Sequence, residues 1–217
     1  MYSLNPCRHP GCSKAAVSNF DEKGEISEGP GFCYEHTADK IKFFDSVMGY
    51  VANHDKVIGL SAGGLEIHDI DLGDKKFYGC NLQGCTFRNV HGNSVRARMC
   101  MFDFSTFSDC DFLKSNIQYS SFAGSKFIHV LLTGSDIIHN NFNGIMAYQC
   151  SYDDSDLYNS RFIKARLINT SMKNCNLKKS VFFESYRDGV SFRLSNTREA
   201  LFDRNKKDSE PETDEEN

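Results

Sequence analysis

The chain has 217 residues, a net charge of −4, 40% hydrophobic residues, 18 phenylalanines, nine cysteines and no tryptophan. These values describe an ordinary soluble protein with room for one large domain or two small ones. No basic segment followed by an apolar run opens the sequence, and no apolar stretch is long enough to span a membrane. We therefore expect a cytoplasmic protein with reduced thiols, which argues against a disulfide framework.

Two closely spaced pairs of metal-ligand residues lie near the N-terminus. Four residues separate Cys7 from Cys12, two separate Cys33 from His36, and twenty lie between the pairs. This spacing suits a tetrahedral site, and paired thiolates favour Zn²⁺ over Mg²⁺ or Ca²⁺. The segment resembles small Cys3His zinc knuckles. We predict a structural zinc site formed by Cys7, Cys12, Cys33 and His36, with His9 as the alternative fourth ligand. Four protein ligands leave no open position, so a catalytic zinc is not expected.

An amphipathic helix is predicted for residues 37–53, with Thr37 as its N-cap. Its apolar stripe consists of Ile41, Phe44, Val47, Met48 and Val51. We expect this helix to cover the end of the following repeat domain, after a small-residue connector at 59–64.

From Ile67 onward the chain has a five-residue period. Every fifth residue from Ile67 to Phe202 is a centre, and 23 of these 28 centres are bulky and apolar. Two residues before each centre, all but two of the 25 positions from Cys80 to Ala200 are Cys, Ser, Ala, Thr or Val. A period of five fits neither a helix nor a flat strand. It indicates a coil that turns a corner in each five-residue unit (a pentad), with the centre and the small residue inside.

This pattern resembles the pentapeptide-repeat family, whose consensus is Ala-(Asp or Asn)-Leu-X-X and whose coils contain four pentads. The best-matching pentads are 80–84, 155–159 and 175–179. The resemblance implies a right-handed four-sided β-helix of about seven coils over residues 67–203. Residues 20 apart would then stack, and this second spacing yields one column of a leucine and six phenylalanines: Leu82, Phe102, Phe122, Phe142, Phe162, Phe182 and Phe202.

The other six cysteines all occupy the small inward position of a pentad: Cys80, Cys85, Cys100, Cys110, Cys150 and Cys175. They are expected to pack as small hydrophobic residues with free thiols. They need no chemical role.

Apolar residues at outward positions form three columns, each with a spacing of twenty, in the C-terminal half of the repeat. Contiguous exposed apolar residues usually mark an interface. We therefore predict that a protein partner, or a second copy in a homodimer, binds through Ile128, Ile138, Tyr148, Tyr158, Ile163, Ile168 and Phe183.

No phosphate-binding loop, nucleophile elbow or paired catalytic motif is present, and His129 is expected to contact Asp109 only as an exposed pair. We predict a non-catalytic protein-interaction scaffold, not an enzyme. The family resemblance implies an alternative, because some pentapeptide-repeat proteins mimic duplex DNA and bind type II topoisomerases such as gyrase. Residues 67–203 contain 16 basic and 14 acidic residues, a net charge of +2. This near-neutral rod argues against DNA mimicry and against nucleic-acid binding.

The predicted organisation is therefore a zinc module over residues 1–36 and a capping helix with connector over 37–66. The β-helix follows over 67–203. A disordered acidic tail is expected over 204–217.

Overall fold

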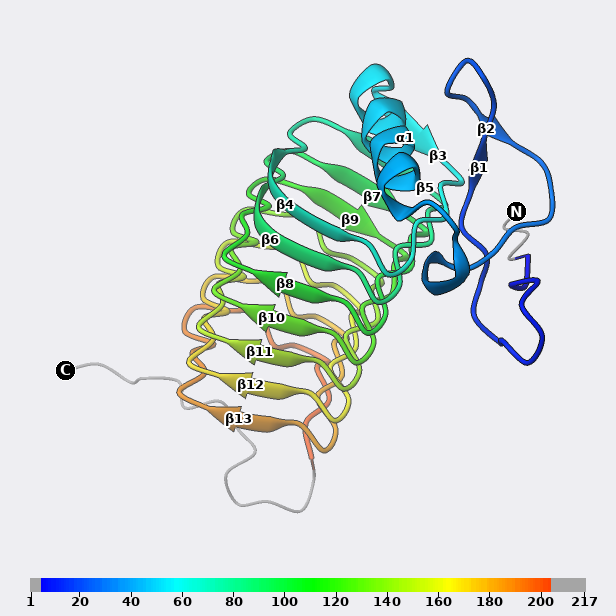
Figure 1. The fold of residues 1–217 in the computed structure, drawn as a ribbon. Helices are drawn as coiled ribbons and strands as arrows, with labels where there is room; N and C mark the ends of the chain where they lie inside the picture. The colour runs from blue at the N-terminus through cyan, green and yellow to red at the C-terminus, as the bar shows by residue number, and fades with distance from the viewer. Residues whose placement is uncertain (1–4, 204–217) are drawn as a thin grey trace.

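The computed structural model describes residues 5–203, most of which belong to one β-helix (Figure 1). Neighbouring coils pair in parallel with an offset of 20 residues, as in Lys56 with Lys76 and Phe107 with Phe127. The four-sided β-helix predicted from the two spacings is confirmed. The acidic tail predicted for residues 204–217 lies outside the described residues.

Two opposite walls of the β-helix are regular enough to form sheets. A seven-stranded sheet has the order β13-β12-β11-β10-β8-β6-β4, with one strand from each coil. Its strands are β4 (Glu66–Asp71), β6 (Thr86–His91), β8 (Thr106–Ser108), β10 (Lys126–Ile128), β11 (Met146–Tyr148), β12 (Arg166–Ile168) and β13 (Tyr186–Asp188). The opposite wall is a four-stranded sheet of β3 (Lys56–Ile58), β5 (Lys76–Tyr78), β7 (Arg96–Arg98) and β9 (Asn116–Gln118), and isolated bridges extend it towards the C-terminus. Isolated bridges also hold the two remaining walls.

The corners of the coil use left-handed backbone. The residue two after a centre has a positive φ at 21 non-glycine positions, for example 60° at Phe104, 54° at Asp109 and 57° at Lys164. Such φ values are uncommon outside glycine. They recur here because the coil must turn once in every pentad, which confirms the corner that the five-residue period predicted.

Centres and small residues fill the interior. Phe142 stacks between Phe122 and Phe162, with ring centroids 5.1 and 5.0 Å away. Gly92 interrupts the bulky centres because a Cβ there would lie 2.5 Å from Cδ1 of Phe112, whose ring occupies the space. One cavity of about 70 Å³ runs along the axis from the underside of the capping helix to Phe142, and all of its lining side chains are apolar. It offers no group for catalysis.

The β-helix starts ten residues earlier than the predicted Ile67. Val57 on β3 and Ala62 in the predicted connector are fully buried as centres of the first coil. The small-residue rule fails here, since Leu60 and Leu65 occupy the positions that should be small and are 1% and 0% exposed. The end of the coil lies under the capping helix, where large side chains are accommodated.

The capping helix α1 (Lys40–Asn53) starts at Asp39, whose carboxylate accepts a hydrogen bond from the N–H of Lys42 at 2.8 Å. The prediction of Thr37 as N-cap is wrong. Thr37 ends a 3-10 turn, η1 (Tyr34–His36), and its hydroxyl donates to the carbonyl of Cys33. Within the described residues, no helix has both the length and the apolar content needed to cross a membrane.

The buried face of α1 also differs from the predicted stripe. Ile41 is 77% exposed, whereas Phe43, Val47, Tyr50 and Val51 are buried. The helix contacts two partners rather than one, because Phe43 and Tyr50 pack against Phe20 of the N-terminal module, with centroids 6.2 and 5.9 Å away. This second contact rotates the buried face away from Ile41.

The N-terminal module lies against the side of the first coil. It contains a short antiparallel pair, β1 (Asn19–Phe20) and β2 (Ile26–Ser27), followed by η1. The N–H of Ser18 donates to the carbonyl of Ser61 at 2.7 Å, and the Ser61 hydroxyl donates to the carbonyl of Ala16 at 2.8 Å. The Tyr34 ring lies against Gly64. The module and the coil are therefore joined by hydrogen bonds and packing.

Lys75 ties α1 to the coil. Its Nζ donates to the carbonyls of Ala52 and His54, both at 3.1 Å, at the C-terminal end of α1, where a positive charge is favourable. We expect Lys75→Ala to lower the free energy of opening α1 by about 1–2 kcal/mol, since two charge-assisted hydrogen bonds are lost at a partly exposed site. Hydrogen exchange of the α1 amides measures this change. Lys76→Ala is the control, and equal effects of both variants would contradict the expectation.

Candidate functional site

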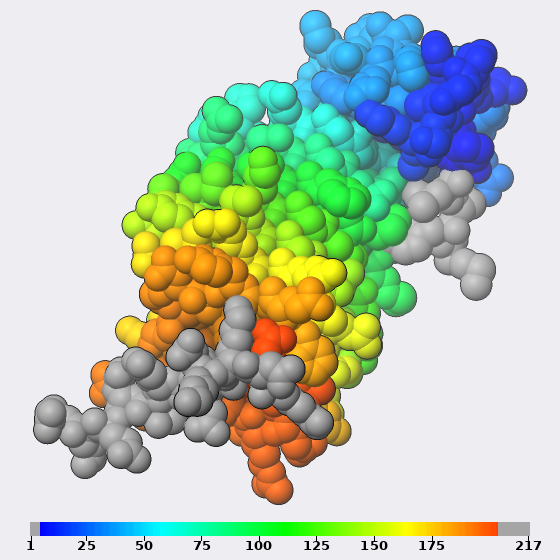
Figure 2. Space-filling view, turned by 90° about the horizontal axis from the view of Figure 1, so that it is seen from below, coloured from blue at the N-terminus to red at the C-terminus, as the bar shows by residue number. Residues whose placement is uncertain are grey.

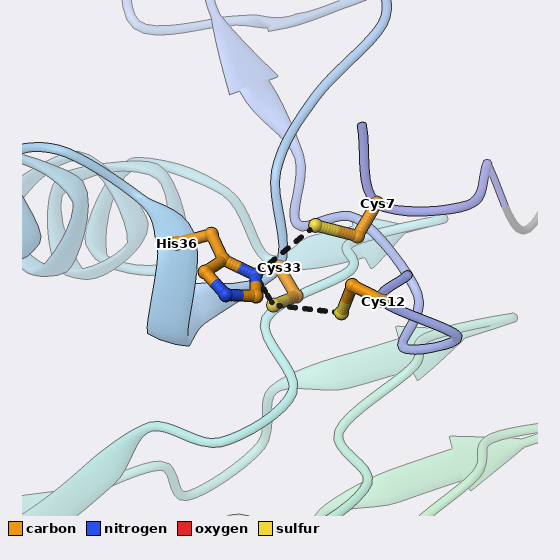
Figure 3. Close-up of side chains that lie close together, drawn as sticks. All are labelled: Cys7, Cys12, Cys33 and His36. Atoms are coloured by element: carbon orange, nitrogen blue, oxygen red, sulfur yellow. Dashed lines mark hydrogen bonds between the residues drawn. The ribbon is translucent and has the colours of Figure 1, made fainter. Parts of the chain in front are cut away.

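The four predicted metal ligands converge in the N-terminal module (Figure 3). Cys7 and Cys12 lie on a tight loop in which the N–H of Cys12 donates to the carbonyl of His9 at 3.0 Å. Cys33 precedes η1 and His36 ends it, so one short helical turn places both side chains on the same side. The predicted pairs, twenty residues apart in sequence, are brought together.

The distances fit a tetrahedral zinc site. His36 Nδ1 lies 3.4 Å from Cys7 Sγ and 3.3 Å from Cys33 Sγ, and Cys12 Sγ lies 3.8 Å from Cys33 Sγ. All four ligand atoms lie within 4.8 Å of one another. Around a tetrahedral Zn²⁺ with usual bond lengths, two sulfurs are about 3.8 Å apart and a sulfur and a nitrogen about 3.5 Å apart. The residues present therefore fit a zinc ion.

The surroundings of Cys7 favour its thiolate form. Burial opposes ionisation of this thiol. Hydrogen bonds from the backbone of Cys33 and His9, and from the side chains of His36 and Cys33, outweigh burial and lower the pKa of Cys7 to about 6. The N–H of His9 donates to Cys7 Sγ at 3.4 Å. A metal-binding cysteine must be deprotonated, so these donors prepare the site for a cation.

His9, the alternative ligand, is not part of the cluster. Its ring stacks on that of His36, with centroids 3.8 Å apart and planes at 5°. Its Nδ1 contacts the carbonyl of Pro10 at 3.1 Å. The cluster that could hold a metal ion therefore contains His36, and His9 makes a packing contact with it. An ion pair between Lys14 and Glu35 also joins the two ligand loops.

The outward residues Ile128, Tyr148 and Ile168 are paired in register on β10, β11 and β12. Two further apolar residues on the same wall, Met146 and Tyr186, are 47% and 52% exposed. The sequence analysis missed them because they occupy a different outward position of the pentad, where the residues that stack with them are Lys126 and Arg166. We call these five residues the β10–β13 patch.

The other predicted interface residues lie elsewhere. Ile138 and Tyr158 belong to the opposite wall, where Asp136 bridges to Asp156. Ile163 and Phe183 lie on a third wall, between these two. The structure therefore does not combine all seven predicted residues into one surface.

His129 and Asp109 form the exposed contact expected from their spacing, at 2.9 Å. His129 Nε2 also lies 2.9 Å from Oε1 of Gln149. The hydrogen bond that His129 donates to the carboxylate of Asp109 is the main reason that the pKa of His129 is raised. The pair stands on an outer corner, away from the apolar axial cavity, and so lacks the enclosed site that catalysis generally uses.

Residues 141–178 match the family model described as pentapeptide repeats, with eight copies. Among solved structures, the chain is similar to full-length QnrB1, a plasmid-mediated fluoroquinolone resistance protein, at 12% identity and a TM-score of 0.34, covering 67% of this chain and 92% of QnrB1. It is also similar to HetL, a pentapeptide repeat protein involved in heterocyst differentiation regulation from Nostoc sp. strain PCC 7120. That match has 11% identity and a TM-score of 0.26, covering 72% of this chain and 92% of HetL.

A third similar structure is a pentapeptide repeat protein from the Arabidopsis thaliana thylakoid lumen. It has 19% identity and a TM-score of 0.31, and the match covers 51% of this chain and 63% of that protein. At such values these similarities support no statement about function. No curated protein matches the chain.

Proposed function

We propose that this pentapeptide-repeat protein is a rigid, non-catalytic scaffold that binds a protein through the β10–β13 patch, with structural Zn²⁺ holding its N-terminal module. The observation that carries the proposal is the patch: Met146, Tyr148 and Tyr186 expose 40–52% of their surface beside the half-buried Ile128 and Ile168. Folding leaves this apolar surface in water, and such surfaces usually mark interfaces.

The composition and setting of the β10–β13 patch suit a protein partner. Tyrosine, methionine and arginine are enriched at interfaces. The guanidinium of Arg166 lies 5.0 Å from the centre of the Tyr186 ring, and the exposed Lys126 adds a polar edge. The wall beneath is held by parallel pairing from β10 to β13. A preformed wall loses little conformational entropy on binding.

The N-terminal module would hold Zn²⁺ with Cys7, Cys12, Cys33 and His36. When bound, the ion supplies folding free energy and no reaction step, since four protein ligands leave no open position. The chain's own residues fix η1, which leads directly into α1 and so orients the cap over the coil. Thiolate ligands require reduced cysteines, which suits the reducing cytoplasm expected from the sequence.

The test is the double variant Ile128→Asp with Ile168→Asp. Two carboxylates in the patch should abolish partner binding, measured by affinity capture from the native host, or dissociate a homodimer, measured by sedimentation velocity. The control pair Gln118→Asp and Ser151→Asp adds the same charge on the other walls. Asp156 already occupies the pentad position equivalent to Ser151, so this control should fold and bind normally. Unchanged capture and unchanged sedimentation of the patch variant would disprove the proposal.

Gyrase binding by DNA mimicry is the weaker alternative. A mimic needs a continuous negative surface, because phosphates dominate the field of DNA. In this rod Lys164 pairs with Glu184, and Lys178 and Lys179 pair with Glu199. A supercoiling assay with purified gyrase tests the alternative, and no effect at micromolar protein would remove it.

A further inference from the structure

The wall formed by β3, β5, β7 and β9 lies near the N-terminal end of the coil (Figure 1). Four basic residues belong to its first three strands. Lys56, Lys76 and Arg96 are paired in register on β3, β5 and β7. Arg98 lies two residues after Arg96 and is in register with Tyr78 and Gln118. We call Lys56, Lys76, Arg96 and Arg98 the basic stripe. Neighbouring strands are about 4.8 Å apart, so its charges follow one another at that spacing.

The basic stripe has no ion-pair partner among the residues that the structure describes. Asp55 and Asp74, the acids just before β3 and β5, make no ion pair with its four bases. The Nε of Arg98 is buried without a hydrogen-bond partner. Lys75, by contrast, has a structural role, because its ammonium group donates hydrogen bonds to the C-terminal end of α1.

Like charges placed opposite one another on adjacent strands destabilise a sheet. The charges of the basic stripe therefore repel one another across β3, β5 and β7, and no ion pair within the described residues offsets this repulsion. Further along the same wall the register of Arg96 continues through Asn116, Asp136 and Asp156, so in this column the positive charge is confined to the first coils.

Apart from Asp55 and Asp74, several acidic residues of these coils lie on or beside the opposite wall. Asp69 and Asp109 have a positive φ and stand at the corner that follows the wall containing β4, β6 and β8. Asp71 and Asp111 come two residues later in the chain. Asp109 pairs with His129, and Asp111 pairs with His91. The near-neutral total therefore hides a local concentration of positive charge in the basic stripe. The net charge of the whole β-helix, which argued against nucleic-acid binding, therefore does not describe the wall formed by β3, β5, β7 and β9.

We propose that the basic stripe binds the phosphate backbone of a single-stranded nucleic acid. The wall is flat and narrow, so a single nucleic-acid strand can lie along the basic stripe. Its negatively charged phosphates complement the positive charge of the stripe. The side chains beside the stripe suit nucleotides rather than an acidic protein. Tyr78 and the 57% exposed Tyr119 offer aromatic surface for bases, and Gln118 offers an amide. These neighbours add contacts that every base can use.

The experiment measures fluorescence anisotropy of labelled dT and rU 20-mers with the full chain between 50 and 200 mM salt. Four phosphate contacts predict a slope of about −3 for log affinity against log salt. Lys76→Gln with Arg96→Gln should halve this slope and weaken binding at least about tenfold at the lowest salt. The control Lys173→Gln with Arg193→Gln removes the same charge from two stacked, exposed positions on another wall and should bind as the wild type does.

Each outcome decides the proposal. No binding at 50 mM salt, a slope near zero, or equal loss in both double variants would overturn it. Tighter binding of a labelled poly-glutamate 20-mer than of either oligonucleotide would identify an acidic protein as the partner and overturn the nucleic-acid assignment. Thermal unfolding checks the fold of the stripe variant, which should be at least as stable as the wild type at low salt because repulsion is relieved.

Discussion

Cys33→Ser should abolish zinc binding and unfold the N-terminal module. We expect one Zn²⁺ per chain in the wild type and none in this variant, measured by metal analysis of the purified protein. Among residues 5–36 the buried apolar side chains are only Cys7, Ala16, Val17 and Cys33, and two of these are ligands. So small a core cannot hold the segment without metal, whose contribution in zinc-finger peptides is about 10–16 kcal/mol. Limited proteolysis should then cleave the module while the coil stays resistant.

Two matched variants make this result specific. Cys85→Ser should keep zinc and stability, because Ser105, next in the same column, already forms the equivalent bond to a carbonyl of the preceding coil at 2.9 Å. His36→Ala should lose zinc, whereas His9→Ala should keep it, since only His36 has a nitrogen in the cluster. One Zn²⁺ per chain in the Cys33→Ser protein would contradict the proposed zinc site.

The repeat could be predicted because its two spacings are properties of the sequence itself. A pentad period defines the inside and outside of the wall, and a spacing of twenty decides which residues stack, such as His129 on Asp109. The first coil escaped detection because Leu60 and Leu65 stand where small residues were expected, and Ala62 stands where a large centre was expected. Both exceptions occur at the end of the coil, where α1 rather than another coil is the neighbour.

The Cys3His cluster was predictable only up to the choice of histidine. His9 and His36 each lie within three residues of a cysteine, so spacing cannot separate them. The direction of η1 does so, by turning the ring of His36 towards Cys7 and Cys33. The buried face of α1 could likewise not be predicted from the sequence, because its contact with Phe20 depends on how the N-terminal module packs against the helix.

Surface properties were the least predictable. A search for apolar residues twenty apart finds the column that contains Tyr148. It does not show that Met146, at a different outward position on the same strand, belongs to the same surface. The net charge of the repeat, in turn, sums the charges of all four walls. Assigning residues to walls separates the basic Lys76 and Arg96 from the acidic Asp109, and this assignment leads to both proposed binding surfaces.

Phe142→Ala should destabilise the coil by about 3–5 kcal/mol, measured by urea unfolding. The Phe142 side chain is 1% exposed, stacks on Phe122 and Phe162, and meets the edge of the Tyr152 ring at 6.1 Å. Backbone hydrogen bonds fix the separation of the coils, as between the N–H of Phe142 and the carbonyl of Arg161 at 2.7 Å. The neighbouring rings therefore cannot close the space, and the cost of the cavity is added to the lost burial.

Phe104→Ala is the matched control, with the same atoms removed in another coil. Phe104 stands at a corner with a φ of 60° and is 74% exposed, so its truncation should change stability by no more than about 0.5 kcal/mol. The two variants differ in whether the ring faces into the coil or into water. Similar losses in both would mean that the phenylalanine column does not stabilise the β-helix, and a rigid wall could then no longer be assumed for either binding surface.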